Sequence, residues 1–454
     1  VNFIYKDHFD SIFAQDDSFS ALVSTLRELA KNTKFQRISL HALQNIKSIV
    51  IKVADVTLDT ESAFVKSRKD VFKELWYPAL FSFNDVIMTG DDLEVRSKAL
   101  NLMFDILVQY GNRFDAQFWD QICVSLLFPI FGVLSKHWEI NQFNSHDDLS
   151  VWLSTTLIQA LRNMIALFTH YFDALSRMLD GYLGLLISCI CQENDTIARI
   201  GRSCFQQLIT QNMEKFTQEH WDKVTESFEK LFELTTAVEL FEADPLKEEN
   251  NIPVSQSTQE LNEENGVDFS ANGDSNNVQK GISRTKSAED IRRKNKSKNA
   301  IVVKCILQLL MIETLSELFD DEKFYTLIPY ESLVKVSGLL EKSFRFARTF
   351  NDDYNLRVRL WNSGVIDKLP NLLKQESSSS AVFISVTFKL YNDTQKITPK
   401  QKDAISASLI PMCVSIVERY VSLDDSTQQR NISTWRPVCL LYTSDAADDM
   451  QCVD

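Results

Sequence analysis

The sequence predicts an all-α protein, a HEAT- or armadillo-like α-solenoid built from antiparallel helix pairs. Glycine and proline are scarce, at 11 and 9 in 454 residues, or roughly 2% each against the usual 7% and 5%. Apolar residues recur at spacings of three and four along most of the chain, which is the period of one buried helix face. The 30 Phe residues and the 44% hydrophobic content suffice for a core that runs through stacked repeats.

The first helical repeats are predicted over residues 1–75. Apolar residues at helical spacing indicate one helix from Phe19 to Leu29 and a second from Ile38 to Val50. A short polar turn from Lys31 to Lys34 separates them. The two helices therefore form an antiparallel pair, which is the unit of an α-solenoid.

The central repeat domain is predicted over residues 76–242. The stretch from Leu93 to Tyr110 presents apolar residues on one face, and Gly111 follows where the helix is expected to end. The stretch from Trp152 to Phe172 is apolar on more than one side, so we expect a buried helix.

A charged insert is predicted over residues 243–299. This segment is rich in Asn, Ser, Glu, Asp and Lys and poor in aromatic residues, so it cannot bury enough surface to offset the entropy of ordering and is expected to be disordered. Arg284 precedes Ser287 by three residues, which makes Ser287 a candidate phosphorylation site. The basic residues near its end favour a solvated hinge, with an import signal or an anionic-membrane contact as alternatives.

Helical repeats are predicted to resume over residues 300–422. The run from Val302 to Leu318 is so apolar that it must lie between other helices. The serine run from Ser377 to Ser380 is interpreted as a short loop. The following stretch from Val382 to Leu390 is rich in Val, Ile, Thr and Phe, which leaves an extended conformation open.

Residues 423–454 are expected to form a disordered tail. The letters CLLYTS at Cys439 to Ser444 are what a transposase adaptor used in sequencing libraries would encode, so we interpret residues 439–454 as a translated artefact. The chain begins with Val1 rather than Met. This start indicates a fragment of a longer protein.

Composition and motifs argue against several functional classes. A net charge of −14 and a pI near 5.1 oppose nucleic-acid binding, which needs surplus Lys and Arg. No signal peptide is visible, and the longest apolar runs fall short of the ~20 residues that span a bilayer. The eight cysteines show no zinc-type spacing, and the common phosphate, dinucleotide, zinc-protease and hydrolase signatures are absent. We therefore predict no catalytic residue, no metal site and no cofactor.

Several blocks in fixed order resemble one known family. They are the start at Trp76 to Pro78, LEVRSKALNLMFDIL at Leu93 to Leu107, WLSTTLIQAL at Trp152 to Leu161, LFTHYF at Leu167 to Phe172, QENDTIARIGRSC at Gln192 to Cys204, and VVKCILQLLMIETL at Val302 to Leu315. Together they are similar to the region downstream of the exchange domain in the large brefeldin A-inhibited, Sec-seven-type guanine-nucleotide exchange factors for Arf GTPases of the late Golgi.

This resemblance implies a regulatory and scaffold role rather than catalysis. In that family the region is helical and regulates the exchange domain. The resemblance implies roles in autoinhibition through other domains of the same protein and in recognition of small GTPases of the Arf, Arl or Rab type. Recruitment to the trans-Golgi membrane and homodimer formation are further implied roles. The implied location is cytoplasmic, with peripheral membrane association. The nucleotide-releasing glutamate belongs to a separate exchange domain, and no segment here matches that domain.

The candidate contact residues are all polar and lie on predicted helices. They are Arg96, Asp195, Arg199, Arg202, Arg345 and Arg348. Each is a candidate for partner binding or for fixing the stacking of repeats. The structural role is favoured for Arg96, Asp195, Arg199 and Arg202, whereas Arg345 and Arg348 contribute to a local positive surface. Two other functional hypotheses remain: a karyopherin-like or general cargo scaffold, and an enzyme of an unfamiliar family.

Overall fold

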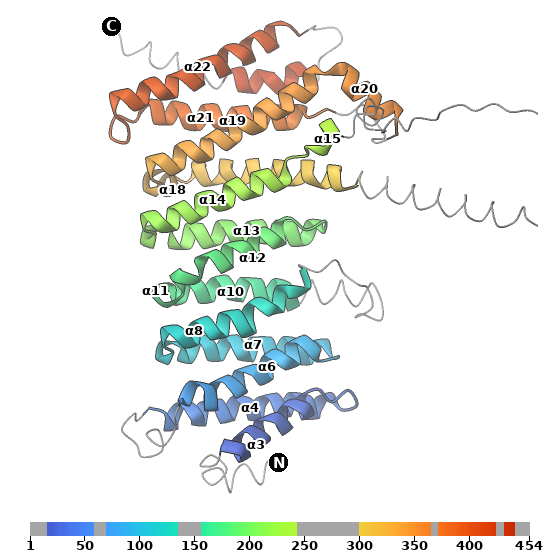
Figure 1. Cartoon of the computed structure of the whole chain (residues 1–454), viewed down its shortest axis with the longest axis vertical. Coiled ribbons are helices and arrows are strands. Elements are labelled where there is room, and N and C mark those ends of the chain that lie inside the picture. The colour runs from blue at the N-terminus through green and yellow to red at the C-terminus, as the bar shows by residue number, and fades with distance from the viewer. Residues whose placement is uncertain are drawn as a thin grey trace, which may run out of the picture. The chain divides into compact units, whose positions relative to one another are not determined.

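The protein is described by a computed structural model that covers residues 16–58, 70–134, 156–242, 299–364, 371–423 and 431–440. All regular elements among these residues are helices (Figure 1). The prediction of an all-α helical array is confirmed. Two compact units divide between Ser227 and Phe228, inside helix α14 (Gln218–Thr235), and each unit is described by itself.

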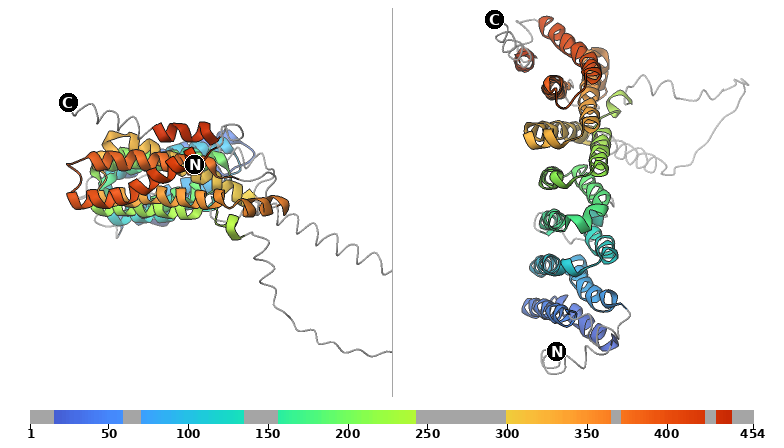
Figure 2. Two further views of the ribbon diagram at one scale, coloured as in Figure 1. Left: turned by 90° about the horizontal axis from the view of Figure 1, so that it is seen from above. Right: turned by 90° about the vertical axis from the view of Figure 1, so that its left-hand side faces the viewer.

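Unit 1 stacks its helices in two layers, seen edge-on in the right-hand view of Figure 2. The first layer consists of α3 (Asp16–Ala30), η1 (Phe72–Trp76), α6 (Tyr77–Thr89), α8 (Ala116–Ile122), η3 (Cys123–Leu127), η4 (Phe128–Leu134) and α12 (Leu179–Ile190). The second consists of α4 (Gln36–Val56), α7 (Leu93–Tyr110), α10 (Ile158–His170) and α13 (Asp195–Asn212). Short connections are η2 (Gly111–Arg113), α11 (Phe172–Leu175), η7 (Ser176–Met178) and η8 (Met213–Lys215).

Side-chain caps fix where several of these helices begin. Asp92 accepts a hydrogen bond from the Val95 amide at 3.0 Å at the start of α7. Asn194 accepts one from the Ile197 amide at 3.1 Å at the start of α13. Such caps satisfy amides that have no partner within the helix, and each is worth about 1 kcal/mol.

A chain of aromatic rings runs through the core of unit 1. Ring centroids lie 5.0 Å apart for Trp76 and Phe114, 5.4 Å for Phe114 and Trp119, and 5.3 Å for Trp119 and Tyr171. Gly111 lies against two of these rings, because a Cβ atom there would stand 2.5 Å from a ring carbon of Trp119. The glycine therefore permits the close approach of the backbone to the aromatic core.

Unit 2 contains the rest of α14, α15 (Glu239–Glu242), a helix over residues 299–320, α18 (Glu322–Leu327), α19 (Tyr330–Asp352), α20 (Tyr354–Asn362), α21 (Leu373–Asn392), α22 (Pro399–Val421) and a helix over residues 431–440. Helix α19 packs along α21, and α21 packs against α22. Part of its core is an apolar cluster that includes Leu240, Ile301, Phe350 and Leu360.

The predicted loop from Ser377 to Ser380 is wrong. These residues lie inside α21, where Ser379 and Ser380 are fully buried. The Ser379 hydroxyl donates to the Gln375 carbonyl oxygen at 2.6 Å, and the Ser380 hydroxyl donates to the Ser377 carbonyl oxygen at 2.9 Å. Local bonds of this kind satisfy a serine in a helix interior. The stretch from Val382 to Leu390 is helical as well.

Order in unit 2 extends beyond the predicted end of the repeats. Residues 431–440 form a helix in which Trp435 is 1% exposed. The expected disorder therefore does not hold for these ten residues, because an indole and Val438 provide them with apolar surface to bury. The insert with Ser287, and residues 441–454, lie outside the described residues.

Helix α22 is long and apolar enough to cross a membrane by length and composition alone. The sequence has no unbroken apolar run of that length, because polar residues interrupt α22. In the structure Ile405, Leu409, Met412 and Ile416 bury one side of α22, while Ile410, Val414, Val417 and Val421 are exposed on another.

Candidate partner-binding surfaces

Arg96 lies inside unit 1 rather than on its surface. Its side chain is 8% exposed, and its Nε donates to the Ile87 carbonyl oxygen at 2.7 Å. Burial lowers the pKa of its guanidinium to about 10, partly offset by the charge of Asp91. The contact joins α7 to the last turns of α6, so Arg96 holds neighbouring helices together.

Asp195 and Arg199 pair with each other on one helix. Their side chains lie 2.8 Å apart at i and i+4 on α13, and both are more than half exposed. Arg202 follows one turn later on α13 and is half-buried. An exposed i,i+4 pair stabilises a helix by only a few tenths of a kcal/mol, and this pair leaves both charges accessible to a partner.

Arg345 and Arg348 behave differently although they are neighbours on α19. Arg345 is 67% exposed and pairs with Glu341 at 2.6 Å within the same helix. Arg348 donates from Nη1 to the Ser415 carbonyl oxygen at 3.1 Å and so links α19 to α22. Arg345 is thus available at the surface, whereas Arg348 fixes helix packing.

A buried carboxylate organises polar groups in unit 2. Glu376 is fully buried on α21, and its Oε2 accepts from the Asn351 side-chain amide at 2.6 Å. Its Oε1 lies 3.7 Å from Arg419 of α22, too far for a hydrogen bond. Burial raises the pKa of Glu376, and the hydrogen bond from Asn351 opposes that shift. Arg419 also pairs with Asp352 at 2.6 Å.

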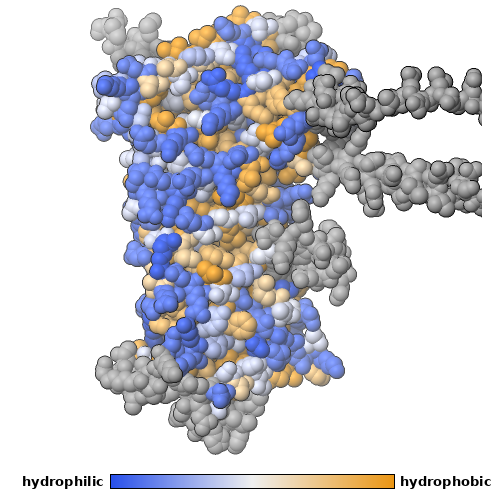
Figure 3. Space-filling view, in the orientation of Figure 1, coloured by the Kyte–Doolittle hydropathy of each residue, from blue (hydrophilic) through white to orange (hydrophobic). Residues whose placement is uncertain are grey.

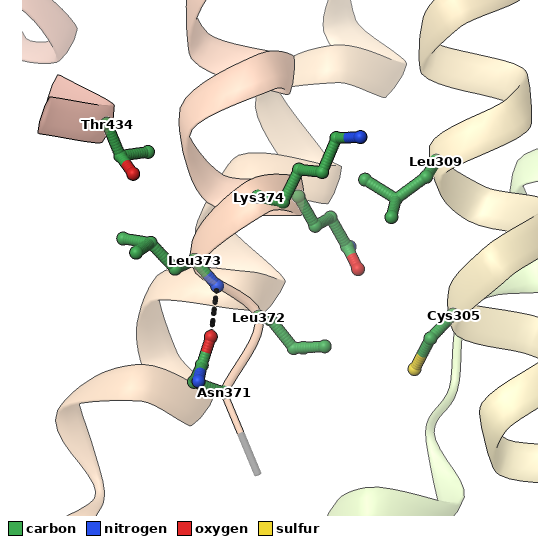
Figure 4. A pocket seen from close by; sticks show the side chains of 8 residues that line it. Cys305, Leu309, Asn371, Leu372, Leu373, Lys374 and Thr434 are labelled. Atoms are coloured by element: carbon green, nitrogen blue, oxygen red, sulfur yellow. Dashed lines mark hydrogen bonds between the residues drawn. The ribbon is translucent and has the colours of Figure 1, made fainter. Parts of the chain in front are cut away.

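Two small cavities lie beside the start of α21. One, of about 340 Å³, is lined by Cys305, Leu309, Lys374 and Thr434 among others (Figure 4). The other, of about 270 Å³, is lined by polar side chains that include Arg357, Glu376 and Arg419. Burial raises the pKa of the Cys305 thiol to about 11, so this thiol stays protonated at neutral pH and is a poor nucleophile.

The largest of these hollows lies in unit 1, on the second layer. This amide groove has a volume of about 580 Å³ and is formed by side chains of α4, α7 and α10. Its amide side chains are Asn101, Gln109, Gln159 and Asn163, its charged ones are Lys47 and Asp105, and its apolar ones are Phe104, Val108 and Ala166. The Gln159 amide donates to the Asn163 amide oxygen at 2.8 Å.

The walls of the amide groove are held by contacts between helices. The Tyr171 hydroxyl, just after α10, donates to the Val108 carbonyl oxygen of α7 at 2.6 Å. Lys47 of α4 lies 3.7 Å from Asp105 of α7. On the separate face drawn in Figure 3, hydrophobic and hydrophilic residues are interspersed along unit 1.

No group of three or more His, Cys, Asp or Glu side chains that could hold a metal occurs among the described residues. The buried thiols of Cys123, Cys189 and Cys204 have pKa values raised by burial, to about 12, 12 and 11 respectively. Among the three hollows described above, the amide groove has the largest volume, about 580 Å³.

The chain is similar in sequence to known proteins. Residues 306–446 match a family model described as the BIG2 C-terminal domain. The chain is 49% identical over 96% of its length to the ADP-ribosylation factor guanine nucleotide-exchange factor SEC7 of Saccharomyces cerevisiae. It is 32% identical over 96% of its length to an ADP-ribosylation factor guanine nucleotide-exchange factor of Schizosaccharomyces pombe.

Over 96% of its length, this chain is similar to one region of large ADP-ribosylation factor guanine nucleotide-exchange factors. The resemblance seen in the sequence is thereby confirmed. Brefeldin A-inhibited guanine nucleotide-exchange protein 1 of Homo sapiens is also similar, at 26% identity over 97% of this chain. The chain spans about a quarter of the length of these relatives. The family match begins at residue 306, inside the helix over residues 299–320.

Sequence reasoning missed both the amide groove and the Glu376 cluster. Asn101 and Asn163 lie on the polar faces of predicted helices, but only the stacking of α7 against α10 brings them to one groove. Glu376 directly precedes the serine run that suggested a loop. Apolar periodicity continuing on both sides of that run was the signal that favoured a single helix.

Proposed function

We propose that this chain is a non-catalytic regulatory and scaffold region of an Arf guanine-nucleotide exchange factor. The observation that carries the proposal is the similarity of 96% of the chain to one region, a quarter of the whole, of relatives named as such exchange factors. The helical array supports it, because stacked repeats present long surfaces suited to binding proteins.

The region would act by binding small GTPases of the Arf, Arl or Rab type. A GTP-bound GTPase that binds the open exchange factor more tightly than the closed one shifts the protein toward the open state. The size of that shift is set by the difference between these two affinities. In the exchange factor, other domains would compete for the same surfaces and impose autoinhibition. Binding to a membrane-attached GTPase would also recruit the protein from the cytoplasm to the trans-Golgi surface, and a second copy is a further candidate partner.

Exposed charges support this role in both units. Asp195 and Arg199 on α13 and Arg345 on α19 are accessible, and charges at the edge of an interface mainly speed and orient association. Arg96 and Arg348, which hold helices together, are not proposed as contacts.

The test is binding of the whole chain to purified Arf-, Arl- and Rab-type GTPases loaded with GDP or a non-hydrolysable GTP analogue. We expect at least one GTPase to bind at least fivefold more tightly in its GTP form, as measured by biolayer interferometry. Equal or absent binding across the set would contradict the proposal. The alternative of a karyopherin-like scaffold predicts binding of basic import signals or a Ran-type GTPase instead.

A further inference from the structure

We propose that the amide groove of unit 1 binds an extended, uncharged polypeptide segment through that segment's main chain. The inference rests on the lining of the groove and does not depend on the exchange-factor role. The expected ligand is an extended segment with an accessible main chain, and a folded GTPase surface does not present its main chain in this way.

Side-chain amides match a peptide main chain in hydrogen-bonding capacity. Asn and Gln each offer two N–H donors and a carbonyl acceptor, while each peptide residue carries one donor and one acceptor. Asn101 on α7 and Asn163 on α10 face the groove from two helices. The bond between Gln159 and Asn163 uses only part of their capacity. These main-chain hydrogen bonds do not depend on the side chains of the bound segment, so any selection among segments comes from the apolar and charged residues of the groove.

The lining of the groove also includes apolar side chains, which we call its apolar floor. Phe104 is 4% exposed, and Val108 is 42% exposed. From Asn101 to Gln109 the helix advances by eight residues, or about 12 Å at 1.5 Å per residue. An extended strand covers that length with about four residues, and alternate side chains point to opposite faces. Every second side chain of a bound segment would therefore meet the apolar floor.

The charges of the lining favour a neutral segment. Lys47 and Asp105 are its charged members and lie 3.7 Å apart, so their charges offset each other. A phosphate chain, an acidic peptide or a basic import signal gains no net attraction from such a lining. The bond from Tyr171 to the Val108 carbonyl oxygen holds α7 and α10 in place, so the groove is formed before a ligand arrives and less ordering opposes binding.

The experiment uses the full chain and an array of acetylated, amidated hexapeptides in which Leu alternates with Ser, Thr or Asn. Binding is measured by fluorescence anisotropy with fluorescein-labelled members of the array. We expect the Asn101→Ala, Asn163→Ala double variant to weaken binding at least tenfold. Gln117→Ala, which removes an exposed amide from α8 in the other layer, is the matched control and should leave binding unchanged.

Two modified arrays separate main-chain recognition from other modes. Methylation of alternate peptide nitrogens removes main-chain donors and should abolish binding. Replacing Ser and Thr by Lys or Glu should weaken binding at least fivefold. The proposal is overturned if no uncharged peptide binds, if only charged peptides bind, or if the methylated peptides or the double variant bind as well as their parents. Circular dichroism verifies that the double variant keeps its helical content.

Discussion

The two units differ in the side-chain contacts that connect several of their helices. Unit 1 is held by a succession of aromatic rings from Trp76 to Tyr171. Unit 2 instead carries a chain of buried amides and hydroxyls across four helices. In it the Thr235 hydroxyl donates to the Gln308 amide oxygen at 2.5 Å, and the amide nitrogens of Gln308 and Gln375 each donate to the Ser343 hydroxyl oxygen at 3.0 Å.

This difference indicates which interactions determine the helix packing in each unit. Aromatic contacts are large but tolerate small displacements, because dispersion is not directional. A buried polar chain is stabilising only when every member finds its partner, so it specifies one alignment of helices. Unit 2 should therefore respond sharply to loss of one hydrogen-bonding group, and unit 1 to loss of aromatic volume.

The largest effect is expected for Trp119→Ala in unit 1. Trp119 is fully buried and its indole N–H donates to the Gly111 carbonyl oxygen at 3.2 Å. Removing it should lower the free energy of unfolding of unit 1 by about 3–5 kcal/mol. Urea unfolding followed by hydrogen exchange of α7 and α8 would measure the change. Trp361→Ala, the control, removes a Trp that is 48% exposed on α20 and should cost less. An equal loss of unfolding free energy for both variants would refute the stabilising role of the buried Trp119 ring.

A smaller effect is expected for Gln308→Leu in unit 2. The substitution keeps the volume but leaves Thr235 and Ser343 without their shared partner, at a cost of about 1–3 kcal/mol in unfolding free energy. Adding Ser343→Ala should cost less than the sum of the two single changes, because each single change already breaks the same hydrogen bond between Gln308 and Ser343. Strict additivity in urea unfolding would show that the polar chain does not act as a unit.

The buried Glu376 should make the stability of unit 2 depend on pH. The folded state raises the pKa of Glu376, chiefly by burial, so this group's stabilising contribution is complete below its ordinary pKa near 4.5. That contribution is lost as pH rises through the raised value. Glu376→Gln does not titrate, so it should gain stability relative to the unmodified chain as pH rises from 4.5. Thermal unfolding across that range measures the difference, and a constant difference would contradict the assignment.

The smallest effect is expected for Arg199→Ala on α13. Its pair with Asp195 is exposed and lies within one helix, so unfolding free energy should change by less than about 0.5 kcal/mol. Arg96→Ala, at a buried site, should cost several times more. Equal losses in urea unfolding for the two arginines would remove the distinction between surface and packing roles.

Much of the fold was predictable because the apolar period, the composition and the helix-capping residues all indicate helices. Leu93 to Tyr110 was expected as one helix with one buried face, and α7 has these bounds. The serine run in α21 and the helix over residues 431–440 were not predicted, since serine propensity and tail composition compete with tertiary burial. The amide groove could not be predicted from the sequence, because it depends on which helices become neighbours rather than on any local pattern.

We propose that this chain binds partners without catalysing nucleotide release. The most direct measurement is release of fluorescent GDP from an Arf-type GTPase in the presence of increasing amounts of the chain. The account predicts a release rate equal to that of the GTPase alone, even at chain concentrations that saturate binding to the GTP form. A release rate that rises with chain concentration would contradict it.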